Sequence, residues 1–183
     1  GINFKTLERS IASYTPFTKN SGADAGGLLI SQNWDQRTAQ SFQELTGSSA
    51  EGDAWQKFYG EIAELAKRIA PSMLQPLKSA EKLKSEIGLS QTWSYLMERP
   101  IGEVIKERFS DDIVRGVVLT DGLIGTFVSA DDLQANRCFL YHLIGNGTGQ
   151  WRVPQGGMGA FVIELKRVAT AAGVEILLNS RVS

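Results

Sequence analysis

The chain has 183 residues, 42% hydrophobic and 21% charged, and its 19 basic and 20 acidic residues give a net charge of −1. This balance lacks the concentrated positive charge of nucleic-acid-binding domains, so we expect no nucleic acid as a partner. The single cysteine, Cys138, and the single histidine, His142, exclude an internal disulfide, a multi-cysteine zinc site and a histidine-rich metal site. We therefore expect no bound metal.

No apolar run approaches the roughly 20 residues that a membrane-spanning helix needs. The chain also does not open with the charged and then apolar pattern of a secretion signal. We therefore expect a cytoplasmic protein whose contact with a membrane is at most peripheral. The chain begins at Gly1 without a methionine and stops at EILLNSRVS, in the middle of what reads as a strand. Natural domains usually end in polar tails, so these ends predict a fragment of a longer protein.

The first 34 residues predict short strands. Residues 9–17 and 26–31 read as two extended segments, and the turn-rich stretch 18–27 joins them into a hairpin. From Asp35 the pattern becomes helical, and residues 35–45 predict a helix that ends at Gly47, because glycine is common just past a helix C-terminus.

The clearest helix of the sequence is predicted over residues 53–70. Ser48, Ser49 and Asp53 offer side chains that can cap its first turn, and Pro71 ends it. An apolar stripe at helical spacing predicts that one face is buried against neighbours. The stripe consists of Trp55, Phe58, Tyr59, Ile62, Leu65, Ala66 and Ile69.

More helices are predicted after Pro71, so that residues 35–149 form one helical region. The helical segments are 77–88, 91–99, 101–109, 111–125 and 131–144. The last two begin with the acidic pairs Asp111-Asp112 and Asp131-Asp132. An acidic pair could bind a metal, but at a helix start it is more typical of a cap.

The chain closes with a change of pattern over residues 150–183. Residues 150–153 read as a strand, an apolar stripe from Met158 to Ala172 predicts a helix, Gly173 ends it, and residues 174–179 read as a second strand. Such a strand–helix–strand unit is the building block of a parallel or mixed sheet. The predicted fold class is therefore α+β, a predominantly helical block followed by the edge of a sheet.

Two glycine clusters are candidates for a cofactor loop. Gly145, Gly147 and Gly149 give G-x-G-x-G after a helix and before a strand, the reverse of the dinucleotide-binding order, so we interpret them as a mobile turn or lid. Gly156 and Gly157 instead follow a strand and open a helix, where a ligand or backbone can approach closely. A tight turn that only packs helix on sheet is the alternative.

Other residues give weaker signals. His142 lies in an apolar helix and is more typical of a packed residue than of a catalyst. The four tryptophans, Trp34, Trp55, Trp93 and Trp151, fit packing better than a nucleic-acid stacking platform. No serine or cysteine lies in a recognisable nucleophile motif. The catalytic residues therefore stay unassigned, and the chain alone shows no self-sufficient active site.

The stretch from Phe109 onward resembles the phytoene desaturase-like flavoproteins, relatives of the flavin amine oxidases. The resemblance rests on RFSDDIVRGVVLTDGLIGTFVSADD and on LYHLIGNGTGQWRVPQGGMGAFVIELKRVATAAGVEILLNSRV. Residues 35–71 look like the family's helical region, and the match is weak before Asp35. In that family a G-G-M-G turn opens a helix, a glycine ends it, and a strand with a terminal valine returns to the FAD sheet. The residues that match this order are Gly156, Gly157, Met158, Gly159, Gly173 and Val182.

The resemblance implies a fragment of an FAD-dependent oxidoreductase. Residues 35–149 would be its substrate or cap region, and residues 150–183 part of its FAD domain, with Gly156, Gly157, Met158 and Val182 beside the cofactor. The parent enzyme would remove hydride from an apolar substrate to flavin N5 and leave a new double bond, although isomerisation and amine oxidation also fit the family. The implied partners are that substrate and the rest of the FAD domain.

The chain departs from the family in one respect that matters for the cofactor. It has no G-x-G-x-x-G loop to hold the FAD pyrophosphate, so the cofactor site is incomplete here and the fragment alone is expected to be inactive. A non-catalytic helical module that binds a partner protein through exposed apolar patches is the alternative function.

Overall fold

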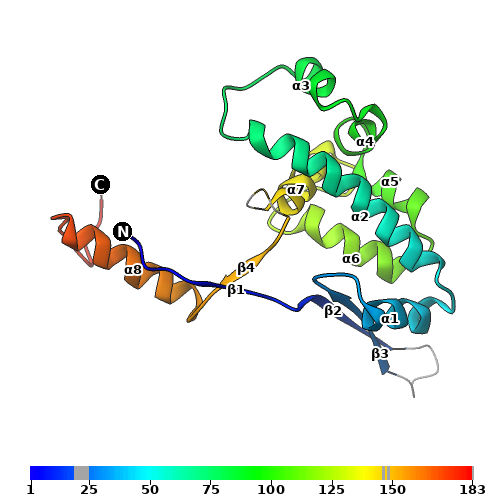
Figure 1. Ribbon diagram of the computed structural model, residues 1–183, viewed down its shortest axis with the longest axis horizontal. Coiled ribbons are helices and arrows are strands. Elements are labelled where there is room, and N and C mark those ends of the chain that lie inside the picture. The colour runs from blue at the N-terminus through cyan, green and yellow to red at the C-terminus, as the bar shows by residue number, and fades with distance from the viewer. Residues whose placement is uncertain (19–24, 146, 148, 183) are drawn as a thin grey trace. The chain divides into compact units, whose positions relative to one another are not determined.

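The computed structural model describes residues 1–18, 25–145, 147 and 149–182 (Figure 1). It divides into two compact units, one formed by residues 1–9 with 151–183 and the other by residues 10–150. The elements in chain order are β1 (Thr6–Glu8), β2 (Ile11–Thr18), β3 (Ala25–Ser31), α1 (Gln36–Thr46), α2 (Ala50–Ile69), the 3-10 turn η1 (Ala70–Ser72), α3 (Ala80–Ile87), α4 (Ser90–Trp93), the π-helical turn η2 (Ser94–Glu98), α5 (Ile101–Arg108), α6 (Asp112–Leu123), α7 (Leu133–Ile144), β4 (Arg152–Pro154) and α8 (Gly157–Ala171).

The larger unit begins with the antiparallel hairpin β2–β3, which confirms the predicted pair of strands. Two aromatic rings of β2 lie on glycines of β3. A Cβ atom added to Gly26 would fall 2.6 Å from the Phe17 ring, and one added to Gly27 would fall 2.1 Å from the Tyr14 ring. Each ring therefore takes the space that a side chain on the facing strand would need.

Helix α1 completes the free edge of β3 with its hydroxyl groups. The backbone N–H of Leu29 donates to Ser41 Oγ at 3.1 Å, and that hydroxyl donates back to the Leu29 carbonyl at 3.0 Å. The N–H of Ser31 donates to Thr38 Oγ1 at 2.9 Å. Because an uncovered strand edge is a template for unwanted pairing, these buried hydroxyls both anchor α1 and protect the edge.

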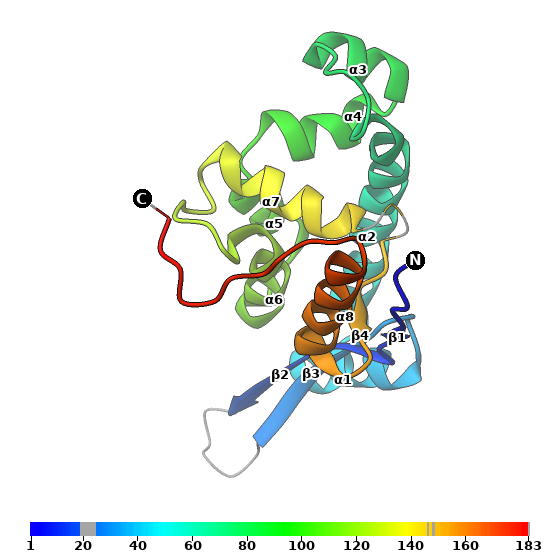
Figure 2. The same cartoon turned by 90° about the vertical axis from the view of Figure 1, so that its left-hand side faces the viewer.

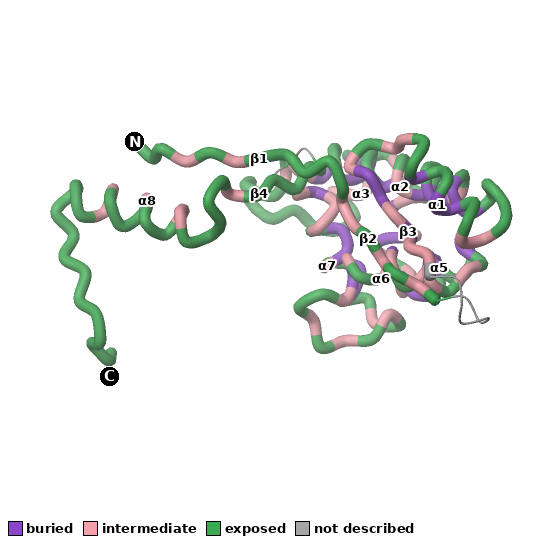
Figure 3. The backbone as a smooth tube through the Cα atoms, turned by 90° about the horizontal axis from the view of Figure 1, so that it is seen from below, coloured by how far each residue is buried: buried purple, intermediate pink, exposed green. Residues whose placement is uncertain are grey.

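Helix α2 is the central element of the larger unit, and the predicted apolar stripe is its buried face. Its residues Phe58, Ile62 and Leu65 are each no more than 1% exposed. The tube in Figure 3 shows the buried segments gathered in this unit. The helix starts earlier than the predicted residue 53, and the expectation of a serine cap is wrong for Ser49, whose helical backbone leaves its side chain without a cap hydrogen bond.

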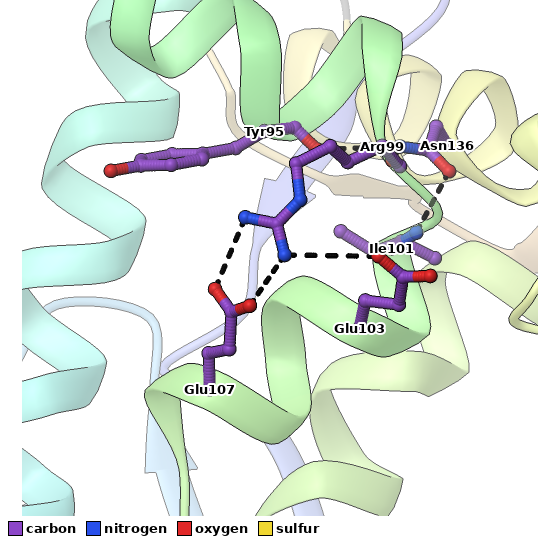
Figure 4. A network of polar contacts seen from close by, with 6 residues as sticks. All are labelled: Tyr95, Arg99, Ile101, Glu103, Glu107 and Asn136. Carbon is purple, nitrogen blue, oxygen red and sulfur yellow. Dashed lines mark hydrogen bonds and ion pairs between the residues drawn. The ribbon is translucent and has the colours of Figure 1, made fainter.

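A buried amide fixes the connection between the π-helical turn η2 and helix α5 (Figure 4). Asn136 of α7 accepts from the Ile101 N–H at 3.0 Å and donates to the carbonyls of Leu96 at 3.1 Å and Arg99 at 2.7 Å. It therefore satisfies backbone groups at the end of one helical segment and at the start of the next. The side chain of Arg99 is half-buried, and its guanidinium pairs with the carboxylate of Glu107.

The smaller unit contains β1, β4 and α8. The two strands form an antiparallel pair in which Leu7 faces Val153. The amino-terminal segment also lies along α8, where the Phe4 and Phe161 rings are 4.8 Å apart and the Asn3 N–H donates to Glu164 at 2.7 Å. Within the described chain, every residue of α8 is exposed or only half-buried, as its green and pink tube in Figure 3 shows.

The predicted α+β class, mostly helical, is confirmed, but the strand–helix–strand ending is only half right. The strand before α8 is present as β4. Residues 174–179 are not a strand in the described part of the chain. A strand needs a neighbouring strand to satisfy its backbone groups, and no described strand lies beside this segment. Strand β4 pairs with β1 in the antiparallel direction, whereas the ending was predicted to belong to a parallel or mixed sheet.

Candidate functional site

The Gly156-Gly157 turn joins β4 to α8 and has an unusual backbone. Both glycines are in the left-handed region, with φ of 83° and 79°. Residues with a Cβ atom rarely adopt positive φ, so the backbone conformation favours glycine at both of these consecutive positions. The β1–β4 pair holds the start of the turn. The Gln155 N–H donates to the Lys5 carbonyl at 3.0 Å, directly beyond the paired residues of the two strands.

The start of α8 is not covered by side chains. Its N-cap residue is Gly156, which has no side chain to accept from the first-turn N–H groups. A Cβ atom at Gly157 would meet nothing within 4 Å, and Met158 beside it is 64% exposed. The positive end of a 15-residue helix is thus left open to an approaching group, and electronegative groups are stabilised there.

A hollow of about 200 Å³ lies beside this turn. It is lined by Asn3, Phe4, Lys5, Gln155 and Ala160. The hollow therefore combines an aromatic wall, an amide and one cationic side chain, a mixture that suits part of a polar cofactor or ligand.

The wall of this hollow is fixed by a carboxylate of α8. A hydrogen bond from the Arg167 guanidinium, helped by the backbone N–H of Asn3, lowers the pKa of Glu164 to about 2. Arg167 also donates to the Gly1 carbonyl at 3.0 Å. The ionised carboxylate therefore ties the amino-terminal segment to α8 at neutral pH.

The structure does not bring all four predicted cofactor residues together. Gly156, Gly157 and Met158 form the turn, whereas Val182 lies beyond the other end of α8 and is 95% exposed. The resemblance placed Val182 on a returning strand, and this segment is not a strand here.

The first glycine cluster closes helix α7. Gly145, Gly147 and Gly149 all have positive φ, and the N–H groups of Gly147 and Gly149 both donate to the Ile144 carbonyl, at 2.9 and 3.2 Å. The cluster follows a helix and precedes β4, which is the predicted order. Its other two residues, 146 and 148, lie outside the described residues, so the interpretation as a lid stays a prediction.

One residue of each acidic pair caps a helix, as predicted. Asp111 accepts from the N–H groups of Ile113 and Val114, and Asp132 accepts from that of Gln134. The described residues contain no group of three or more His, Cys, Asp or Glu side chains that could hold a metal ion.

A half-buried polar cluster in the larger unit was missed by the sequence reasoning. It comprises Tyr59 of α2, Asp121 of α6, and Cys138 and His142 of α7. The His142 Nδ1 lies 2.9 Å from the Cys138 carbonyl and 3.6 Å from its sulfur. The thiol donates to the Ile124 carbonyl at 3.3 Å.

Burial sets the protonation of this cluster. Burial raises the pKa of Asp121, although the nearby His142 opposes the shift. Burial, and then the Asp121 charge, raise the pKa values of Tyr59 and Cys138. The Cys138 thiol is therefore protonated at neutral pH and is a poor nucleophile. The cluster can form hydrogen bonds, but it does not supply a thiolate.

Comparison with known proteins finds partial similarity to longer chains. An uncharacterized protein of Mycobacterium tuberculosis is 33% identical over 190 residues, which cover 100% of this chain and 35% of that protein. The mouse pyridine nucleotide-disulfide oxidoreductase domain-containing protein 2 is 28% identical over 122 residues, or 61% of this chain and 21% of that protein. Its rat counterpart is 26% identical over the same shares.

The chain thus spans about a third of the length of the mycobacterial relatives it matches, and it is related to an oxidoreductase-domain protein. No protein-family model matches the chain. No solved structure matches it either.

Proposed function

We propose that this chain is the substrate or cap region, with one FAD-domain element, of an FAD-dependent oxidoreductase similar to the phytoene desaturase-like dehydrogenases. The observation that carries the proposal is the open Gly156-Gly157 turn at the start of α8, in a chain related to an oxidoreductase-domain protein. When bound, FAD would accept hydride from an apolar substrate.

The residues around the turn fit a cofactor edge. The space above Gly157 is free of side chains, and the first turn of α8 has no side-chain cap to compete with a ligand. Lys5 and Gln155 border the adjacent hollow and would offer a charge and an amide to polar groups of the cofactor. Met158 would supply an adaptable apolar contact.

The exposed apolar surface of the smaller unit supports a location inside a larger protein. Apolar side chains that are at least 60% exposed occur along α8 and after it, namely Met158, Val162, Ile163, Leu177, Leu178 and Val182. So much exposed apolar surface marks a contact region. In our proposal the rest of the FAD domain covers this surface, and Val182 reaches the cofactor only in that assembly.

A pair of glycine variants in the full-length protein tests this proposal. Gly157 and Gly173 both have positive φ, 79° and 86°, and both have nothing within 4 Å of an added Cβ. Gly157→Val and Gly173→Val therefore impose similar backbone strain at opposite ends of α8. We expect Gly157→Val to lower bound FAD per protein, measured by absorbance, several-fold more than Gly173→Val, at similar losses of Tm.

Two results would contradict the proposal. Equal flavin loss in both variants would mean that the turn is only structural, and full-length protein purified without flavin would favour the non-catalytic interaction module. The 183-residue chain alone is expected to leave FAD fluorescence unchanged in a titration, since it has no pyrophosphate loop.

A further inference from the structure

The half-buried polar cluster lies where three helices of the larger unit meet, with one residue from α2, one from α6 and two from α7. Helix α7 packs against both α2 and α6, and Figures 1 and 2 show the three helices side by side. Within the described chain, no helix is long and apolar enough to cross a membrane. The interior beside the cluster is apolar, since one residue of each helix, Phe58, Val118 and Phe139, is no more than 1% exposed. Polar groups in such surroundings are unfavourable unless they are hydrogen-bonded.

Two of the four side chains use their donors inside the protein. The Cys138 thiol donates to the Ile124 carbonyl at 3.3 Å. The His142 Nδ1 lies 2.9 Å from the Cys138 carbonyl oxygen, and because that oxygen can only accept, Nδ1 carries the proton. These two donors are therefore already used.

The other two side chains have unused hydrogen-bonding groups. The Tyr59 hydroxyl and the Asp121 carboxyl make no hydrogen bond or ion pair with any residue that the structure describes. Asp121 is an exception in this respect, because every other half-buried aspartate or glutamate of the described chain accepts a hydrogen bond. Those residues are Asp35, Glu61, Asp111, Asp132 and Glu164.

Packing holds the two unused groups in place. The Tyr59 ring stacks on Trp55 with centroids 4.4 Å apart, and it lies 6.4 Å from the Phe139 ring of α7. Next to Asp121, a Cβ atom added to Gly122 would lie 3.6 Å from the Phe139 Cβ atom, so α6 and α7 approach closely at this point. Little further ordering of either group is therefore needed for binding.

The surroundings favour the neutral forms of both groups. Burial raises the pKa values of Tyr59 and Asp121, and the Asp121 charge raises that of Tyr59 further. A neutral phenol and a neutral carboxyl each donate an O–H, and a carbonyl oxygen can accept from two donors through its two lone pairs. An ammonium group suits the cluster less well, because His142 lies close enough to Asp121 to repel a second cation whenever its ring is protonated.

We propose that the Tyr59 hydroxyl and the Asp121 carboxyl together bind the carbonyl oxygen of an otherwise apolar ligand. The aromatic and aliphatic side chains beside them would contact the hydrocarbon part of that ligand. The inference rests on the proposed function for the role of this ligand, which is the substrate, and it adds a ketone or aldehyde group to an apolar substrate.

The test uses the full-length protein and two aromatic probes of the same shape. Methyl naphthyl ketone carries a carbonyl, and isopropenylnaphthalene has a methylene group in place of the carbonyl oxygen. Equilibrium dialysis measures the Kd of each probe. We expect the ketone to bind at least about threefold more tightly, and its C=O stretching frequency to fall on binding, because two hydrogen bonds form to its oxygen.

A tyrosine variant and a matched control make the test specific. Tyr59→Phe removes the hydroxyl and keeps the ring, so it should weaken ketone binding about two- to tenfold and leave the hydrocarbon probe unaffected. The control is Tyr95→Phe, because Tyr95 is also half-buried but its ring lies against Arg108, outside the cluster. It should bind both probes as the unmodified protein does.

A second variant tests the protonation of the carboxyl. Ketone binding should weaken as the pH rises and Asp121 loses its proton, since a carboxylate repels a carbonyl oxygen. Asp121→Asn keeps an N–H donor, so it should bind the ketone within about threefold of the unmodified protein at low pH and lose this pH dependence. The titratable groups that interact with Asp121 are Tyr59 of α2 and Cys138 and His142 of α7, and all three are present in both proteins.

Three results would overturn the proposal. They are equal binding of the two probes, equal loss of ketone binding in Tyr59→Phe and Tyr95→Phe, and an unchanged pH dependence in Asp121→Asn. Flavin absorbance of the same samples separates this inference from the proposed function. Flavin-bearing protein that binds both probes equally would overturn the carbonyl site alone, whereas flavin-free protein that prefers the ketone would overturn the proposed function alone.

Discussion

Replacing Asn136 by alanine should strongly destabilise the larger unit. The residue is 2% exposed, and its amide accepts from the Ile101 N–H and donates to the Arg99 carbonyl (Figure 4). It also donates to the carbonyl of Leu96. A buried unsatisfied N–H costs about 1–3 kcal/mol, and each lost amide–carbonyl bond about 0.5–1.5 kcal/mol. The free energy of unfolding should therefore fall by about 2–6 kcal/mol, a large part of the roughly 5–15 kcal/mol typical of a domain.

The measurement is urea unfolding followed by far-UV circular dichroism, with Gln134→Ala as the control. Gln134 is an exposed residue of the same helix, so its loss should change the free energy of unfolding by less than about 0.5 kcal/mol. A loss below about 1 kcal/mol for Asn136→Ala would refute the reasoning, because solvent would then have replaced the amide without cost.

Asn136→Asp separates hydrogen bonding from the loss of volume. A carboxylate can still accept from the Ile101 N–H, but its second oxygen would face the Leu96 and Arg99 carbonyls, which are also acceptors. We expect this variant to be at least as unstable as Asn136→Ala at pH 7. Burial beside carbonyls would raise the pKa of the new carboxyl, so its stability relative to Asn136→Ala should improve as the pH falls and the carboxyl regains a donor.

Two further predictions concern packing and acid. Ile62 of α2 is 1% exposed, so Ile62→Ala should lower the free energy of unfolding by roughly 2–5 kcal/mol in the same assay. A loss below about 1 kcal/mol would mean that this face of α2 is open rather than packed against neighbours. Because the pKa of Glu164 in the folded chain is about 2, below its value in an unfolded chain, the attachment of residues 1–9 to α8 should contribute stability above about pH 4.3 and lose it as the pH falls toward 2. An NMR titration of the Glu164 carboxyl checks this, and a midpoint near 4.3 would contradict it.

Elements whose signal is local were predicted correctly. The stripe of α2 repeats at helical spacing, Gly47 ends α1 with a φ of 77°, and Asp111 caps α6, all within a few neighbouring residues. The second strand of the ending was wrong for the opposite reason. Residues 174–179 have the composition of a strand, but a strand forms only beside a partner, and composition cannot supply one.

The same distinction applies to the candidate sites. Gly156 and Gly157 were found because a turn between a strand and a helix leaves a local mark in the sequence. The cluster of Tyr59, Asp121 and Cys138 left none, since three separate helices contribute to it. No periodicity of a single helix reports such a meeting of distant residues.

The rings that lie on the glycines of the β2–β3 hairpin give this hairpin a spectroscopic signature. The Cα hydrogens of Gly26 and Gly27 lie close to the rings of Phe17 and Tyr14, whose circulating π electrons shift the resonances of nearby nuclei. Their proton resonances should therefore move away from the usual α-proton positions of glycine when the hairpin forms. Two glycine signals in an unlabelled one-dimensional spectrum would then report directly whether the hairpin is paired, in the isolated chain or inside the longer protein.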